Sequence, residues 1–138
     1  MTSRPVVIHT DGGARGNPGP AAIGVVIERD GKVIQRISRV IDSTTNNQAE
    51  YQAVYAALLC AKDYGATSID LYADSELIVK QLRGEFKLKN RELAQWFIKI
   101  HSLVNAIGRV RFHAITRENN TAADALVNQA LDRPEQAR

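Results

Sequence analysis

Four carboxylates in this sequence are placed where they could act together: Asp11, Glu50, Asp74 and Asp124. Singly, each has an ordinary interpretation. Asp11 can be a turn residue before glycine, and Asp74 can cap the helix that follows it. Glu50 and Asp124 can be acids in the first turn of a helix, Asp124 at a capping-box spacing from Thr121. Jointly, two acids that end strand-like runs and two near helix starts predict a cluster at one edge of a sheet.

The chemistry that such a cluster supports is the binding of a hard divalent cation. No Lys or Arg stands directly beside any of the four acids in sequence, so converging carboxylates would repel one another unless a cation joined them. Oxygen ligands favour Mg²⁺ or Mn²⁺ over Zn²⁺, and neither a cysteine cluster nor a histidine pair at ligand spacing competes. Two such ions held about 3.5–4 Å apart suit in-line phosphoryl transfer.

The elements that must position these acids follow from hydrophobic periodicity and turn residues. Asp30-Gly31 between two β-branched runs is a strong hairpin signal, and Gly65 is a typical helix stop. Residues 12–20, with their glycines, are expected to form a loop. We expect strands over 5–11, 21–29, 32–40, 68–74 and 109–115, and helices over 46–65, 75–84, 91–108 and 120–132.

This order of elements predicts an α/β fold built on a mixed five-stranded sheet, with three antiparallel strands, then parallel crossovers, and helices on both faces. Ligands of such sheets gather at the carboxyl ends of the strands. If the first and fourth strands are neighbours, Asp11 and Asp74 share that edge. We expect one domain over 1–138, with its core at about 5–131 and a flexible tail at 132–138.

Composition bounds the class of protein. The 138 residues are 44% hydrophobic and 24% charged, which is ordinary for a globular domain, and the net charge of +3 permits a polyanionic partner without requiring one. No apolar run is long enough to span a membrane, and the N-terminus lacks a signal-peptide pattern. We therefore expect a soluble, cytoplasmic monomer with no membrane partner, in which Cys60 is a small buried hydrophobe.

Four blocks around the acids resemble the signature of the type 1 ribonuclease H family. They are TDGGARGNPGP at 10–20, TTNNQAE at 44–50, YADSELIV at 72–79 and NNTAADALVNQA at 119–130, and the resemblance spans about residues 5–131. It implies a ribonuclease H-like fold and a metal-dependent endoribonuclease that cuts the RNA strand of RNA–DNA hybrids. The family uses two Mg²⁺ ions, for which Mn²⁺ can substitute, and leaves 5′-phosphate and 3′-hydroxyl ends.

The resemblance also implies roles for single residues. The catalytic, metal-binding acids of the family fall on Asp11, Glu50, Asp74 and Asp124. Asp11 would bridge both ions, and Asp124 would complete the site of the ion that activates water. Glu50 and Asp74 would hold the other ion. The RNA strand would be distinguished by its 2′-hydroxyls, with nucleic-acid contacts at Gly12, Gly13, Asn17, Asn46 and Asn47, and with Thr45 near the DNA-strand phosphates.

One departure from the family pattern lies just before the last acid. Many members carry a histidine in a loop there, whereas this chain reads TRENNTAAD at 116–124. Arg117 in that segment can substitute electrostatically, as an auxiliary residue, but it cannot act as a general base near neutral pH. We expect His113 to be a strand residue rather than a catalytic one.

A second departure lies between the two middle helices. Many relatives insert a basic, tryptophan-bearing helical protrusion where this chain has only LRGEFKLKNREL at 82–93, so we interpret it as a short form. Its basic residues either attract phosphates or form a solvated loop: Arg83, Lys87, Lys89 and Arg91. Fewer phosphate contacts predict lower affinity and a shallower salt dependence. Trp96, in the following helix, is expected in the core.

Three alternative functions remain open at this level. The first is a catalytically silent module that binds RNA–DNA hybrids, which the missing histidine favours and the four filled acid positions oppose. The second is a nuclease that also cleaves double-stranded RNA. The third is a DNA-processing enzyme of the integrase, transposase or junction-resolvase kind, which shares this sheet but which the asparagines and the glycine loop disfavour.

Overall fold

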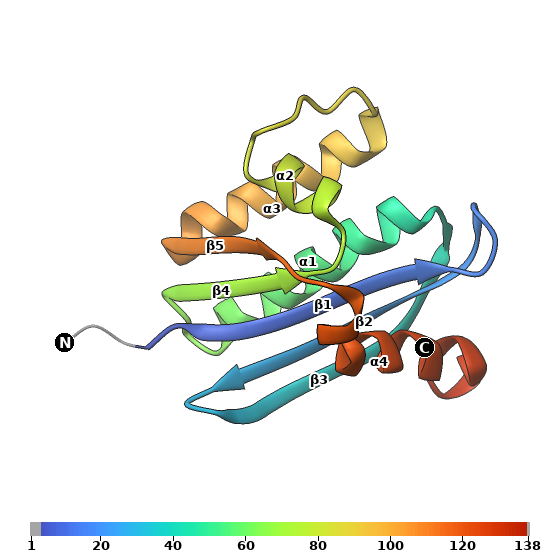
Figure 1. Ribbon diagram of the computed structural model, residues 1–138, viewed down its shortest axis with the longest axis horizontal. Helices are drawn as coiled ribbons and strands as arrows, with labels where there is room; N and C mark the ends of the chain where they lie inside the picture. The colour runs from blue at the N-terminus through green and yellow to red at the C-terminus, as the bar shows by residue number, and fades with distance from the viewer. Residues whose placement is uncertain (1–3, 138) are drawn as a thin grey trace.

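A mixed five-stranded sheet forms the centre of the computed structural model, which describes residues 4–137 (Figure 1). The strands lie in the order β3-β2-β1-β4-β5, with β1, β2 and β3 antiparallel and β1, β4 and β5 parallel. The predicted fold class is confirmed. The elements are β1 (Val6–Ala14), β2 (Gly19–Arg29), β3 (Lys32–Thr44), α1 (Asn46–Asp63), β4 (Ser68–Ala73), α2 (Glu76–Leu82), α3 (Arg91–Ile107), β5 (Arg109–Ala114) and α4 (Thr121–Asp132).

Helices cover both faces of this sheet, and the apolar pattern of β2 shows why. Every residue from Ala21 to Ile27 is buried, as is typical of a strand that is covered on both sides. Val25 and Ile27 belong to the large core that includes residues of α1, α2 and α3, whereas Ala22 belongs to a smaller core with α4. Figure 1 shows α4 on the opposite side of the sheet from the other three helices.

Strand β1 is longer than the sequence predicted. It continues past Asp11 to Ala14, because Gly12 and Gly13 keep their pairing with β2. Only residues 15–18 connect the two strands, so the glycine loop expected over 12–20 was wrong at both ends. Pairing with a long neighbouring strand overrides the low strand propensity of glycine. Strand β3 likewise extends to Thr44 rather than to residue 40.

The C-terminal residues continue the fold beyond α4. Pro134–Gln136 form a 3₁₀ turn, and the carbonyl oxygen of Ala137 accepts a hydrogen bond from the Val40 N–H of β3 at 2.8 Å. The tail predicted at 132–138 therefore starts on the last residue of α4, and its described part reaches the edge strand. No helix between residues 4 and 137 combines the length and the apolar character needed to cross a membrane.

Two side chains that the sequence predicted in the core lie at its margin. Cys60 and Trp96 are only partly buried against the large core. The Trp96 ring meets Tyr55 edge-on, with 5.5 Å between ring centroids, and the Lys99 ammonium group lies 4.7 Å from the Trp96 ring centroid. An amphipathic ring on the rim of a helix pair can pack on one side and contact a cation on the other.

Candidate active site

Asp11 and Asp74 lie beside each other where two parallel strands stop pairing. The β1–β4 ladder ends with Thr10 opposite Ala73, so Asp11 and Asp74 are the next residues along the two strands. Asp74 directly follows β4, one residue beyond the strand that the sequence had predicted it to end, whereas Asp11 lies inside β1 and is not a turn residue. The strand order therefore brings two carboxylates to one edge of the parallel half of the sheet.

Gly12 allows helix α1 to bring Glu50 to the same edge. A Cβ atom on Gly12 would lie 2.2 Å from the backbone carbonyl carbon and oxygen of Ala49 and 2.5 Å from the nitrogen of Glu50. Any side chain there would push α1, and Glu50 with it, away from β1. Gly12 is buried beneath this helix. Gly13 has more room, since its nearest neighbour would be 3.5 Å from a Cβ atom.

Gly24 has the matching role for helix α4 on the other face. It is the cross-strand partner of Asp11, and a Cβ atom on it would lie 2.2 Å from the carbonyl oxygen of Ala123. This close approach fixes Asp124, the next residue, beside Asp11. Thr121 is the first residue of α4 rather than its cap, so the capping-box interpretation of Asp124 was wrong.

Asp124 does lie in the first turn of α4, as predicted, but the ordinary interpretations of Asp74 and Glu50 fail. Ser75, rather than Asp74, caps α2, and its side chain accepts a hydrogen bond from a backbone N–H of the first turn. Thr45 caps α1. Glu50 was predicted in the first turn of that helix but lies beyond it. Local helix chemistry therefore does not account for Asp74 or Glu50.

Three of the acids converge closely enough to share one ligand. Asp11, Glu50 and Asp74 each offer a carboxylate oxygen, and these oxygens lie within 4.8 Å of one another. Asp124 lies near enough to Asp11 for its charge to raise the pKa of that carboxyl group. All four acids line a single cavity of about 270 Å³. The structure thus brings together every acid that the sequence singled out.

This convergence raises the pKa of two of the acids. Burial, and then the charges of Asp74 and Asp124, raises the pKa of Asp11 to about 7. Burial, and then the charges of Asp11 and Asp74, raises the pKa of Glu50 to about 8. Without a cation the site therefore holds protons near neutral pH, and a bound cation would displace them.

The donor set fits a hard divalent cation. Glu50 Oε2 is buried and has no hydrogen-bond partner among residues 4–137, although buried polar atoms are normally satisfied. None of the four acids forms a salt bridge with a Lys, Arg or His within that part of the chain. Converging carboxylates without a protein counter-charge are typical of sites that bind Mg²⁺ through oxygen ligands.

The polar residues that the family resemblance assigned to nucleic acid gather at the β1–β2 connection and the start of α1, whereas Gly12 and Gly13 lie on β1. Asn46 Oδ1 accepts a hydrogen bond from the Ala14 N–H at 2.8 Å, and Asn17 Oδ1 accepts one from the Asn46 N–H at 3.1 Å. Asn17, Asn46 and Asn47 are exposed, and Asn46 lines the cavity. The Thr45 hydroxyl oxygen accepts a hydrogen bond as the α1 cap.

Arg117 lies in the segment that lacks the loop histidine. It is exposed, it begins the 3₁₀ turn Arg117–Asn119, and it lines the same cavity as the acids. Its charge acts to lower the pKa of Glu50, against the larger effects that raise it. His113 lies on β5, as predicted, with its Nε2 2.8 Å from Asp70 Oδ1.

Sequence reasoning missed two asparagines that hold the acids. Asn120 is buried, and its Nδ2 donates a hydrogen bond to Asp74 Oδ2 at 2.9 Å. Asn128 Nδ2 donates one to Asp124 Oδ2 at 3.3 Å. The available signals were an asparagine before a helix and an i, i+4 spacing, and both are more simply interpreted as helix capping and helix-surface pairing.

The segment between α2 and α3 is short, as the sequence predicted. Residues 83–90 form neither helix nor strand. Arg83 Nε donates a hydrogen bond to the Phe112 carbonyl oxygen at 2.8 Å, which ties this segment to β5. Lys87 and Lys89 are exposed. Arg83 is thus engaged within the protein, and the lysines are free to attract a polyanion.

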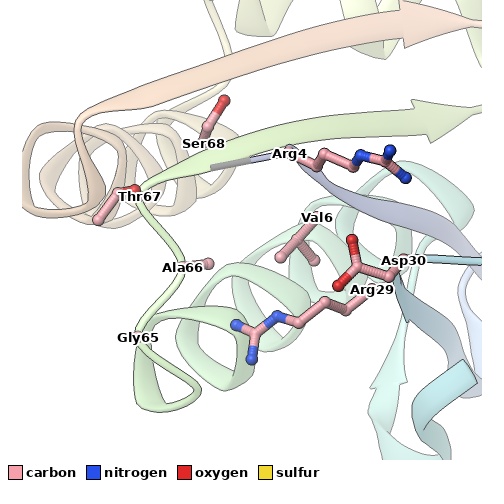
Figure 2. A pocket seen from close by; sticks show the side chains of 8 residues that line it. All are labelled: Arg4, Val6, Arg29, Asp30, Gly65, Ala66, Thr67 and Ser68. Atoms are coloured by element: carbon pink, nitrogen blue, oxygen red, sulfur yellow. The ribbon is translucent and has the colours of Figure 1, made fainter. Parts of the chain in front are cut away.

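A second cavity, of about 320 Å³, opens near the start of β1, remote from the acids (Figure 2). It is lined by Arg4, Arg29 and Asp30 together with residues 65–67 between α1 and β4 and Ser68 at the start of β4. Figure 2 shows the guanidinium groups of Arg4 and Arg29 directed away from each other. Arg29 Nη2 also donates a hydrogen bond to the Tyr64 carbonyl oxygen at 3.0 Å. This larger cavity has no convergent set of reactive groups.

Known proteins resemble this chain over most of its length. The reverse transcriptase-like family matches residues 9–130. A ribonuclease HI of Halobacterium salinarum is 41% identical over 125 residues, which are 90% of this chain and 63% of that protein. A bifunctional protein of Mycobacterium tuberculosis is 38% identical over 129 residues, which are 92% of this chain and 35% of that protein. The chain thus spans less than two thirds of the length of either relative.

A solved structure extends this similarity to the whole fold. The crystal structure of LC11-RNase H1 in complex with an RNA/DNA hybrid is similar with a TM-score of 0.89 and 42% identity, over 94% of this chain and 98% of that one. The strand order and the cluster of acids are those that the resemblance of the four sequence blocks to type 1 ribonuclease H implied. The chain therefore belongs to the type 1 ribonuclease H family.

Proposed function

We propose that this protein is a metal-dependent endoribonuclease that hydrolyses the RNA strand of RNA–DNA hybrids. The observation that carries the proposal is the convergence of carboxylate oxygens from Asp11, Glu50 and Asp74 within 4.8 Å, without a salt bridge from the described residues to balance them. The substrate class is supported by LC11-RNase H1, the 42% identical protein whose structure contains an RNA/DNA hybrid.

Each acid has a binding task in this proposal. Asp11, Glu50 and Asp74 would hold one Mg²⁺ ion, and Asp11 and Asp124 would hold a second, with Mn²⁺ as a substitute. When bound, the ions supply an activated water and stabilise the leaving oxygen, which gives 5′-phosphate and 3′-hydroxyl ends. The chain itself keeps the oxygens converged, and Asp11 and Glu50 must release the protons that their raised pKa values retain near neutral pH.

The exposed asparagines would distinguish RNA from DNA. An amide side chain both donates and accepts hydrogen bonds, as a 2′-hydroxyl does. Asn17 and Asn46 are linked to each other and to β1 by hydrogen bonds, so they are already oriented before substrate binds. Thr45 stands at the N-terminal end of α1, which favours a nearby phosphate.

The test uses one end-labelled RNA strand alone, paired with DNA, and paired with RNA, beside a DNA duplex of the same sequence. Wild type and Asp11→Asn are incubated with Mg²⁺, Mn²⁺ or EDTA. The proposal predicts internal, metal-dependent cuts in the hybrid that are absent from the mutant. Cuts in double-stranded RNA would widen the substrate class. Cuts in the DNA duplex, or a bound but intact hybrid, would contradict the proposal in favour of a DNA-processing enzyme or a silent module.

A further inference from the structure

Asn120 connects three elements around the acids. It immediately precedes α4 and is 1% exposed. Its Nδ2 donates one hydrogen bond to the Thr10 carbonyl oxygen of β1 at 2.9 Å and another to Asp74 Oδ2 at 2.9 Å. One buried amide group therefore links the β1 backbone, the carboxylate that follows β4, and the start of the helix that carries Asp124.

The orientation of this amide follows from its partners. Both groups that it contacts are acceptors, and only the NH₂ end of a carboxamide can donate two hydrogen bonds. The reverse orientation would place Oδ1 against two oxygens. As a result, Asn120 Oδ1 is left buried without a partner among residues 4–137. Such an orphan acceptor is unfavourable, so the contribution of Asn120 must lie in its two donated bonds.

A neutral donor has a specific advantage beside these acids. A Lys or Arg in this place would also hold the Asp74 carboxylate, but it would cancel part of the negative charge that a divalent cation requires. The Asn120 amide donates a hydrogen bond to Asp74 Oδ2 and carries no charge itself. The bond therefore brings no positive charge to the site, and the second oxygen of Asp74 is not engaged by this amide.

We propose that Asn120 is a positioning residue that orients the Asp74 carboxylate for divalent cation binding. The inference rests on the proposed function, because it assumes that the acids hold a metal ion. Groups that orient metal ligands by hydrogen bonding typically change metal affinity or activity by about 10–100-fold when they are removed. A residue that only joined α4 to β1 would instead change folding stability alone.

The experiment measures Mn²⁺ binding by calorimetry for wild type, Asn120→Ala and Asn120→Leu. Leucine keeps the approximate shape of asparagine and removes both donors together with the orphan acceptor, so it separates positioning from packing. The matched control is Asn119→Ala, because Asn119 is exposed and, among residues 4–137, its Nδ2 donates only to Thr116 Oγ1, at 2.9 Å. Circular dichroism and metal-free thermal unfolding accompany each variant, and steady-state cleavage of the hybrid gives kcat and KM.

We expect both Asn120 variants to fold and to bind Mn²⁺ about 10–100-fold more weakly than wild type, with kcat lowered at saturating hybrid and KM changed less than about twofold. Asn119→Ala should match wild type. Unchanged Mn²⁺ affinity in a folded Asn120 variant would overturn the inference, and so would loss of folding in both, since Asn120 would then be structural. A wild type that binds no Mn²⁺ and cleaves nothing would instead overturn the proposed function.

Discussion

Two of the cavities of this molecule differ in a way that separates a reactive site from a surface depression. The cavity of about 320 Å³ near the start of β1 contains Arg4, Arg29 and Asp30, and Arg29 is bonded to the C-terminal end of α1. The cavity of about 270 Å³ where β1 and β4 stop pairing contains four acids, and none of them has a salt bridge within residues 4–137.

The difference shows that cavity size does not identify the site, whereas unbalanced charge does. In the larger cavity opposite charges occur together and a main-chain acceptor is satisfied. In the smaller one, like charges are held together against their repulsion by the packing of α1 on Gly12 and of α4 on Gly24. Such an arrangement is unfavourable without a ligand, and perturbed acids of this kind are typical of functional sites.

The largest effect should come from substituting an acid of the smaller cavity, with an acid of the other cavity as the control. Asp11→Asn should reduce the rate of hybrid cleavage by about 10³-fold or more, because it removes a metal-binding oxygen and its charge from the centre of the cluster. Asp30→Asn, in the other cavity, should leave the rate within about twofold of wild type. Cleavage rates of end-labelled hybrid check both, and substantial activity in Asp11→Asn would contradict the role of the acids.

The pH dependence of stability should also report on the acids. The pKa of Asp11 rises from 3.8 to about 7 and that of Glu50 from 4.5 to about 8. The folded, metal-free protein therefore binds more protons than the unfolded chain. The free energy of unfolding that this protonation contributes is complete below about pH 4 and is lost as the pH rises through 7–8. We expect the free energy of unfolding in EDTA to fall by several kcal/mol between pH 5 and pH 9, with about 7 kcal/mol as the upper bound that the two pKa shifts set.

Urea unfolding at several pH values measures this trend. Asp11→Asn should flatten the curve, because the substituted group no longer titrates, and Mg²⁺ should raise the Tm more at pH 9 than at pH 5. A metal-free protein that becomes more stable from pH 5 to pH 9 would show that the acids are not crowded as described.

A side chain on Gly24 should disturb the site through helix packing. Gly24→Ala places a methyl group 2.2 Å from the Ala123 carbonyl oxygen, so α4 must move and Asp124 must move with it. We expect a loss of about 1–3 kcal/mol in unfolding free energy, with a fall in activity measured on fully folded protein. Gly13→Ala, where the nearest atom is 3.5 Å away, serves as the stability control, and equal stabilities of the two variants would contradict this account.

Arg117 should have a smaller effect because it is exposed. Arg117→Ala removes a positive charge that faces Glu50, and we expect turnover of the hybrid to slow by no more than about tenfold. Arg117→Lys should recover most of the rate if the effect is electrostatic. Arg4→Ala, in the other cavity, provides the comparison, and identical rates for Arg117→Ala and wild type would show that Arg117 takes no part.

The smallest effect is expected from the exposed lysines between α2 and α3. Lys87→Ala and Lys89→Ala should each weaken hybrid binding a few-fold and reduce the slope of log affinity against log salt by up to about 1. These slopes are measured by introducing each lysine substitution into Asp11→Asn, which should bind the hybrid without cutting it, and by determining hybrid affinity at several salt concentrations. Slopes that match the parent protein would assign both lysines to a solvated loop.

Much of this protein could be predicted from residue types and spacing. The hairpin at Asp30-Gly31 and the order of strands and helices were predicted correctly, because periodicity and turn chemistry are local properties, and the four acids were predicted to meet at one edge of the sheet, where they line one cavity. The end of β1 was misplaced because glycine has low strand propensity, whereas pairing with β2 extends through Ala14. Asn120 was missed because its partners lie 46 and 110 residues away in sequence.

The amino-acid sequence by itself determined which groups are available: four acids without adjacent basic residues, glycines at 12 and 24, and asparagines around them. Only the tertiary structure decided their purpose. Gly12, which the family resemblance assigned to a nucleic-acid contact, also leaves the space that α1 needs to approach β1 closely. The placement of β4 beside β1 and of a helix on each face brings the four acids into one cavity. Repulsion between charges depends on distance through space, and this distance exists only after the sheet has formed.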